Sequence, residues 1–108
     1  MADLSSITEI IATYEKHGWI LRRVLLSQAT KQALGSSVES LPVFDADIDA
    51  AWFSRPPKSG GTAWEIRYLG DIPFALLENI DEDSPTFEND LSALQARLND
   101  AVGARKSA

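Results

Sequence analysis

The chain has 108 residues, of which 44% are hydrophobic and 24% are charged, and this length and composition are typical of one globular domain. It contains no cysteine, which excludes disulfides, thiolate nucleophiles and cysteine-bound zinc or iron–sulfur sites. The formal net charge of −6 disfavours nucleic acids and anionic membranes as partners.

The first predicted elements are a helix and a strand. Ser6 and Glu9 match a capping box, apolar residues recur at helical spacing after them, and Gly18 supplies a stop, so residues 6–17 predict a helix. Residues 19–26, WILRRVLL, are a short apolar run after that stop and predict a strand, with a continuing helix as the competing interpretation. Each face of this strand would carry one arginine among apolar side chains.

A short helix and a long loop follow the first strand. Ser27 can cap a helix over residues 28–34, and Gly35 can end it. The segment 35–49 is polar, contains one proline and lacks clear periodicity, so it predicts mostly loop.

Residues 50–55, 62–69 and 73–80 predict three consecutive strands. In the middle segment apolar and charged side chains alternate, which is typical of a strand with one buried face. Gly70 and Asp71 then give a two-residue turn signal. The buried face would carry Trp64, Ile66 and Tyr68.

The last predicted element is a helix over residues 85–102. Ser84 is a natural N-cap, Pro85 suits the first helical position, and a leucine-rich stripe recurs at helical spacing. We expect a frayed tail over residues 103–108. Together the elements predict a single α+β domain over residues 1–108. Its four-stranded antiparallel sheet would be packed on one face by the N-terminal and C-terminal helices, with a short helix after the first strand.

A glycine-rich segment, SRPPKSGGT over residues 54–62, has the composition of a phosphate-binding loop. The P-loop pattern needs a glycine before the lysine and a helix after the loop. Here prolines precede Lys58, and the segment after the loop has a strand pattern. We therefore expect a hairpin loop, with a weak anion site at Arg55 and Lys58 as the alternative.

Neither the single histidine nor the acidic run at residues 45–49 matches a metal or catalytic site. His17 stands at the predicted end of the first helix, where an imidazolium ion stabilises the helix dipole, and it has no visible partner. The run DADID begins like a calcium-binding loop, but Ala50 and Pro56 stand where the signature needs glycine and glutamate. We expect a solvated acidic edge there, no metal site and no cofactor.

The sheet face away from the helices is predicted to carry two groups of side chains. A polar cluster of Arg23, Glu65, Arg67 and Glu78 can bind a ligand, although cross-strand ion pairs explain the same residues. An apolar patch on the same face would exceed what a monomer usually exposes, and a homodimer would bury it. The patch residues are Leu69, Ala75 and Leu77.

The whole sequence favours a binding protein rather than an enzyme, because it lacks the usual nucleophile and metal constellations. Neither a leader sequence nor an apolar run of about 20 residues, the length of a membrane span, is visible, so we expect a soluble, cytoplasmic protein. We expect a homodimer that uses an exposed sheet face or edge to bind a partner polypeptide. The alternative is a small enzyme or small-ligand-binding domain built on the Arg/Glu cluster. The chain resembles small dimeric secretion chaperones in size, acidity and helix–sheet content alone.

Overall fold

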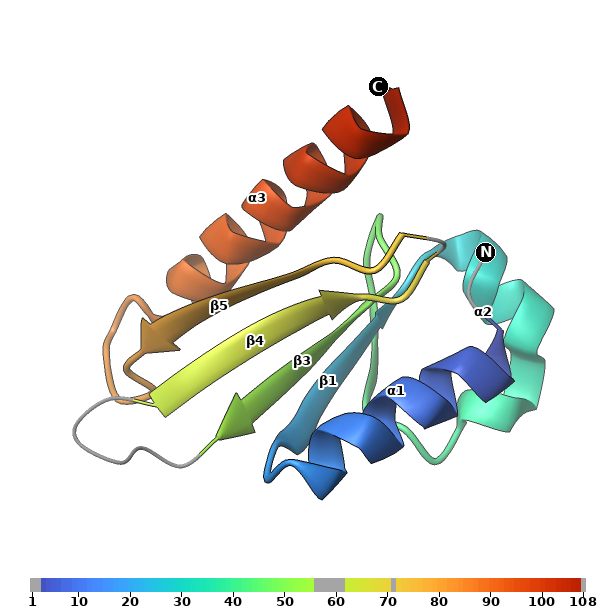
Figure 1. Cartoon of the computed structure of the whole chain (residues 1–108), viewed down its shortest axis with the longest axis horizontal. Helices are drawn as coiled ribbons and strands as arrows, with labels where there is room; N and C mark the ends of the chain where they lie inside the picture. The colour runs from blue at the N-terminus through green and yellow to red at the C-terminus, as the bar shows by residue number, and fades with distance from the viewer. Residues whose placement is uncertain (1–2, 56–61, 71, 108) are drawn as a thin grey trace.

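The computed structural model describes residues 3–55, 62–70 and 72–107 (Figure 1). This part of the chain contains three α-helices, five strands and one short 3-10 helix, η1. In chain order they are α1 (Leu4–Lys16), β1 (Ile20–Leu26), α2 (Gln28–Leu34), η1 (Gly35–Val38), β2 (Val43–Asp45), β3 (Ala50–Arg55), β4 (Thr62–Tyr68), β5 (Ala75–Ile80) and α3 (Phe87–Ser107). Among these residues, no helix combines the length and the hydropathy needed to cross a membrane.

The five strands form one mixed sheet in the order β2-β1-β3-β4-β5. The pairs β1–β3, β3–β4 and β4–β5 are antiparallel, whereas β2 is parallel to β1. The structure confirms the predicted α+β class, and it corrects the predicted four-stranded antiparallel sheet to a five-stranded mixed one. The additional strand, β2, lies in the segment predicted as loop. It has only three residues, Val43–Asp45, which is too short to show a periodic pattern.

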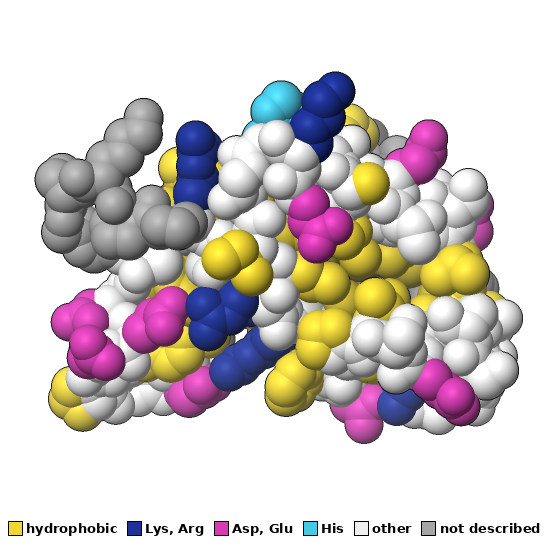
Figure 2. Space-filling view, turned by 90° about the horizontal axis from the view of Figure 1, so that it is seen from below, with side chains coloured by type: hydrophobic (Ala, Val, Ile, Leu, Met, Phe, Trp, Pro, Cys, Tyr) yellow, Lys and Arg dark blue, Asp and Glu magenta, His cyan; other side chains and the backbone are white. Residues whose placement is uncertain are grey.

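The edge of the sheet at β1 and β2 is irregular. β2 pairs only with Val24–Leu26 of β1, and the β1–β3 register shifts between Leu21 and Arg23, the mark of a β-bulge. Ile20 and Phe44 near this edge are 52% and 48% exposed. Figure 2 views the molecule from below Figure 1, where β1 is the lowest labelled strand, and shows Lys and Arg side chains beside hydrophobic ones. A bulge and charged side chains are devices that protect an edge from pairing with another strand.

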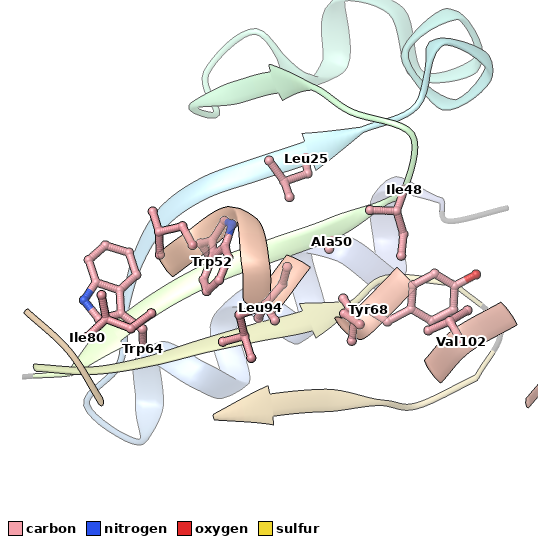
Figure 3. Close-up of a cluster of buried hydrophobic side chains, with 12 residues drawn as sticks. Leu25, Ile48, Ala50, Trp52, Trp64, Tyr68, Ile80, Leu94 and Val102 are labelled. Atoms are coloured by element: carbon pink, nitrogen blue, oxygen red, sulfur yellow. The ribbon is translucent and has the colours of Figure 1, made fainter. Parts of the chain in front are cut away.

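The helices α1 and α3 lie on opposite faces of the sheet, and the prediction that both cover one face is wrong. On one face, Ile7 and Ile11 of α1 are buried in a core with Ala51 and Phe53 of β3. On the other face, α3 packs over β4 and β5, and Figure 3 shows the buried side chains of this core. The core of that face contains Leu25, Ile48, Ala50, Trp52, Trp64, Ile66, Tyr68, Ile80, Leu91, Leu94, Leu98 and Val102.

The central strand β3 explains why both faces need a helix. Residues 50–54 of β3 are all buried, which is typical of a strand covered on both faces. Trp52 belongs to the α3-side core and the next residue, Phe53, to the α1-side core. One helix cannot cover both side chains, so the two terminal helices divide them. The predicted buried face of β4 is confirmed, and it faces α3.

Local side-chain chemistry sets the helix ends. Asp3 caps α1 in place of the predicted Ser6, because the Asp3 carboxylate accepts a hydrogen bond from the Ser6 backbone N–H at 2.8 Å. Gly18 has a φ of 88°, the left-handed conformation that the predicted helix stop requires. Ser27 caps α2, as predicted. The last helix, α3, continues through the predicted tail to Ser107, so the prediction of its end at residue 102 is wrong.

Candidate functional site

The α1 side of the sheet is covered over only part of its width. α1 packs on β1 and β3, and β4 and β5 lie beyond it (Figure 1). The pairing register identifies the side chains on the uncovered part, because opposed residues share a face. Glu65 opposes Phe53 of the α1-side core, and Leu77, which is 60% exposed, opposes Glu65. This surface is named the open half-sheet, and its residues are Glu65, Arg67, Ala75 and Leu77.

Two hollows border α1 where it faces the open half-sheet. The larger has a volume of about 560 Å³ and the smaller about 200 Å³. Thr13 and Tyr14 line both, so the two hollows adjoin along the side of the helix, and together they are named the α1 groove. Its other lining residues are Glu9, Ile10, Ala12, His17, Trp19, Glu65 and Arg67.

Tyr14 links α1, which forms one side of the α1 groove, to β4 of the sheet. Its hydroxyl donates a hydrogen bond to the Glu65 carboxylate, and its ring stacks on Phe53 with the centroids 4.1 Å apart. Trp19 meets the same ring edge-on at 6.1 Å. Burial, followed by the hydrogen bond to Glu65, raises the pKa of Tyr14 above its ordinary range. Tyr14 therefore stays neutral at physiological pH and acts as a fixed donor that ties α1 to β4.

Arg67 is the positive group of the open half-sheet. It opposes Ala75 across the β4–β5 pair and lines the larger hollow. Its guanidinium donates a hydrogen bond to the Tyr68 carbonyl. A guanidinium has five N–H donors, so this bond leaves donors for an acceptor placed in the groove.

The four predicted ligand residues lie on two different faces. Glu65 and Arg67 are on the α1 side, as the register shows. Arg23 and Glu78 are on the α3 side, where they oppose Trp52 and Trp64. There Arg23 donates two hydrogen bonds to Glu88 at 2.8 and 3.1 Å, and Glu78 lies 3.7 Å from Arg97; both contacts are with α3. The structure therefore brings Glu65 and Arg67 together and separates them from the other two.

Of the three predicted interface residues, two lie on the open half-sheet and one is buried. Ala75 and Leu77 are on β5, opposite Arg67 and Glu65. Leu69 is only 1% exposed and belongs to the α1-side core. Its N–H donates to the Asp49 carbonyl at 2.9 Å, which continues the β3–β4 pairing one residue beyond Tyr68. The predicted apolar patch is therefore reduced to its two β5 residues.

The predicted anion site is only partly within the described residues. Lys58 and the glycine-rich run lie outside them. The Arg55 guanidinium lies 5.5 Å over the Trp19 ring. On the two sides of the loop the strands pair antiparallel, with Arg55 opposite Ala63, so the hairpin is confirmed and the helix that a P-loop requires is replaced by a strand.

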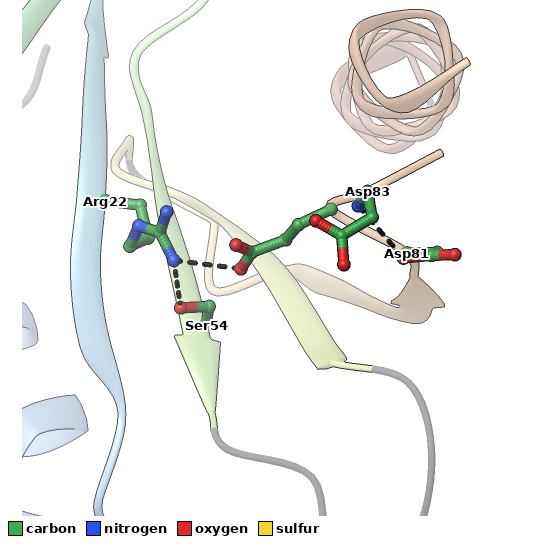
Figure 4. Close-up of polar contacts among 5 residues, drawn as sticks. Arg22, Ser54, Asp81 and Asp83 are labelled. Atoms are coloured by element: carbon green, nitrogen blue, oxygen red, sulfur yellow. Dashed lines mark hydrogen bonds and ion pairs between the residues drawn. The ribbon is translucent and has the colours of Figure 1, made fainter. Parts of the chain in front are cut away.

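Arg22 has a role that the sequence did not indicate. The bulge beside it places Arg22 on the α3 side together with its neighbour. Its guanidinium lies 4.8 Å over the Trp64 ring and donates to Ser54 at 3.0 Å and to Glu82 at 3.1 Å (Figure 4). Because an unpaired residue in a strand leaves no periodic signal, nothing in the sequence reveals this contact.

Comparison with known proteins assigns no function. No family model matches the chain, and neither the curated proteins nor the solved structures contain a match. Within the described ranges, no three His, Asp or Glu side chains are grouped so that they could hold a metal ion. The case for a function therefore rests on the geometry of the open half-sheet and the α1 groove.

Proposed function

We propose that the protein is a small, acidic, cytoplasmic, non-enzymatic binding protein that acts as a homodimer and holds a partner polypeptide on its open half-sheet. The observation that carries this proposal is the incomplete cover of the α1 side. Helix α1 covers β1 and β3, and Leu77 stands 60% exposed in the middle of β5. An uncovered sheet face bordered by a groove offers a concave surface for a partner.

The dimensions of the open half-sheet suit a helical segment of the partner. Two strands span about 10 Å at a spacing of about 4.8 Å, and a helix with its side chains is about 10 Å wide. A helix beside α1 would place apolar residues on Leu77, Ala75 and Ile10. An acidic residue on the same helix could reach Arg67. Recognition of an amphipathic helix in a groove is a common mode of peptide binding.

The ionisable groups of the site support binding rather than catalysis. Tyr14 is held neutral by its raised pKa, and its hydroxyl already donates to Glu65. Elsewhere, the Ser6 N–H lowers the pKa of Asp3, and Arg23 lowers the pKa of Glu88, so both carboxylates remain ionised in structural contacts. A general acid or base needs a pKa near the working pH. The pKa values of Tyr14, Asp3 and Glu88 are all shifted away from neutral pH.

A second candidate function is the binding of a small anionic molecule. The larger hollow, at about 560 Å³, falls in the range of small-molecule sites, roughly 300–1,000 Å³. Arg67 lines it and offers guanidinium donors. The cluster on which the sequence based this alternative now reduces to Tyr14, Glu65 and Arg67. In a thermal-shift screen, Arg67→Ala should abolish the shift that an anionic ligand produces without unfolding the protein.

A matched pair of threonine variants tests the polypeptide proposal. Thr8 and Thr13 both lie on exposed positions of α1, and their hydroxyls donate to the carbonyls of Leu4 and Glu9 at 3.0 and 2.9 Å. Only Thr13 lines the α1 groove. Tagged wild type and Thr8→Trp should capture the same polypeptide from the source cell, whereas Thr13→Trp, which fills the groove, should lose it. Equal capture by all three proteins would contradict the proposal.

A further inference from the structure

The strand β5 ends the sheet on the side opposite the bulged edge. Its six residues, Ala75–Ile80, pair with β4 without any register shift. In the part of the chain that the structure describes, no strand pairs with its outer side. Unlike the opposite edge at β1 and β2, this edge has no bulge, contains no proline, and carries the 60% exposed Leu77 at its centre. A straight edge with an exposed apolar residue is a template for pairing with another strand.

The β4–β5 ladder shows which backbone groups point outward. The Tyr68 N–H donates to the Phe74 carbonyl at 2.8 Å, so these two residues form a hydrogen-bonded pair. Hydrogen-bonded and non-hydrogen-bonded pairs alternate along antiparallel strands. Residues 76, 78 and 80 therefore bond to β4, whereas the N–H and C=O groups of Ala75, Leu77 and Asn79 point away from it, to the open edge.

We propose that two copies of the chain pair antiparallel through β5 about a two-fold axis at Leu77, which forms one ten-stranded sheet. This inference rests on the proposed homodimer and specifies its contact. Directly opposed residues of an antiparallel pair lie on the same face, whereas successive residues of one strand alternate between faces. A two-fold axis midway between two residues would oppose residues of different faces, so the axis must pass through a residue. With the axis at Leu77, both copies contribute residues 75–79, and the two Leu77 residues exchange N–H···O hydrogen bonds.

The charges near the edge select this register. An axis at Glu78 would place two carboxylates directly opposite each other in a non-hydrogen-bonded pair, where the Cα atoms approach to about 4.5 Å. With the axis at Leu77, Glu78 opposes Leu76 of the second copy. Each Glu78 also brings its own cation, because Arg97 lies 3.7 Å away. Two acids and two bases then surround the axis, so the net charge of −6 does not produce like-charge contacts there.

The pairing would enlarge the proposed binding surface. The two-fold axis is perpendicular to the sheet, so the open half-sheets of both copies lie on the same face and share a border at Leu77. Four strands, about 19 Å across at a spacing of about 4.8 Å, then form a floor with one α1 on each side. A partner polypeptide could contact both copies at once.

Single cysteine variants test the register directly, because the chain contains no cysteine. In the proposed dimer the two Leu77 Cα atoms are about 5.5 Å apart, within the roughly 4.4–6.8 Å that a disulfide spans. Leu77→Cys should form a covalent dimer under mild oxidation. Asn79→Cys is the matched control, since the two Asn79 Cα atoms would lie about 14 Å apart. A monomeric wild type in light scattering, or a crosslink at Asn79 and not at Leu77, would overturn the proposal.

A proline variant separates the edge from the fold. The Leu77 N–H points away from β4 and makes no hydrogen bond within the sheet of one copy. Leu77→Pro should therefore keep the circular dichroism of the wild type and lose the dimer. Leu77→Lys should do the same through charge repulsion. A dimer that survives both changes refutes pairing at β5. The two proposals fail in different experiments. If the proposed function is wrong, Thr13→Trp captures the partner as well as wild type does, and Leu77→Cys still forms the covalent dimer.

Discussion

The hydroxyl of Tyr14 offers the sharpest test of how α1 is held on the sheet. Tyr14→Phe removes one oxygen atom and leaves the ring stack on Phe53 in place. A hydrogen bond to a charged group contributes about 1.5–3 kcal/mol. Tyr14 is half-buried, so solvent screens part of this contribution, and the free energy of unfolding should fall by about 1–2 kcal/mol. In a domain of this size the Tm should fall by roughly 4–10 °C.

The raised pKa of Tyr14 adds a pH dependence of defined sign. Burial and the hydrogen bond to Glu65 raise the pKa of Tyr14 above its ordinary value of about 10. Between the two values the unfolded chain has lost the tyrosine proton and the folded protein retains it, so this contribution to stability is present below about pH 10 and decreases above it. The variant has no such proton. Its deficit should therefore shrink above about pH 10, by at most about 1.4 kcal/mol per pH unit before solvent screening.

Urea unfolding followed by tryptophan fluorescence measures both effects, at neutral pH and again above about pH 10. Tyr14→Ala is the companion variant, because it also removes the ring that contacts Phe53 and Trp19 and should destabilise the protein more than Tyr14→Phe does. Equal stability of wild type and Tyr14→Phe at neutral pH would refute the hydrogen bond as a fixed tie. A deficit that stays constant above about pH 10 would refute the cause given for the raised pKa.

Other substitutions test the packing around the site. Asp49→Ala should lower the free energy of unfolding by about 1–3 kcal/mol, because the carboxylate accepts hydrogen bonds from the Ser27 N–H at 2.8 Å and from the buried Thr30 hydroxyl at 2.6 Å; urea unfolding with an unchanged m-value checks this. Leu98→Ala should cost about 2–5 kcal/mol in the same assay, since Leu98 of α3 is fully buried against the sheet. Leu77→Ala should cost no more than roughly 0.5 kcal/mol when the protein is dilute enough to separate the copies.

The elements with strong periodicity could be predicted from the sequence. Residues 62–69 alternate apolar and charged side chains, and the structure shows a strand there whose apolar face is buried. The hairpin at the glycine-rich segment could also be predicted, because a strand pattern follows Gly61 where a phosphate loop needs a helix. Gly18 and Ser27 were found from cap chemistry alone, since their signals are local.

The arrangement of helices about the sheet could not be read with the same rules. The prediction assigned one buried face to the sheet from the alternation in β4. The continuous apolar run in β3, Ala50–Phe53, carried the opposite information, because such a run indicates a strand covered on both faces. The bulge between Leu21 and Arg23 then moved one arginine to the face of the other. A one-residue bulge reverses the faces to which all the following residues of the strand point, and the alternation of residue types in the sequence does not show where a bulge occurs.

The candidate site depends on contacts between distant segments. Glu65 was predicted as a member of the polar cluster, and nothing in the sequence paired it with Tyr14. Their hydrogen bond joins residues 51 positions apart, which no local pattern reports. Leu77 was predictable because its exposure follows from strand alternation. The burial of Leu69 was not predictable, since it depends on packing in the α1-side core between segments far apart in the sequence.

The two proposals are coupled through β5, which belongs to the open half-sheet and also forms the proposed contact with the second copy. A partner that contacts both half-sheets binds the dimer more tightly than the monomer. By thermodynamic linkage the same partner must strengthen dimerisation by the same factor. Leu77→Pro should therefore weaken capture of the partner, because it removes the dimer and also a residue that contacts the partner. Thr13→Trp should remove the effect of the partner on dimerisation while leaving the dimer itself. Equal capture by wild type and Leu77→Pro would show that neither the dimer nor Leu77 contributes to binding of the partner.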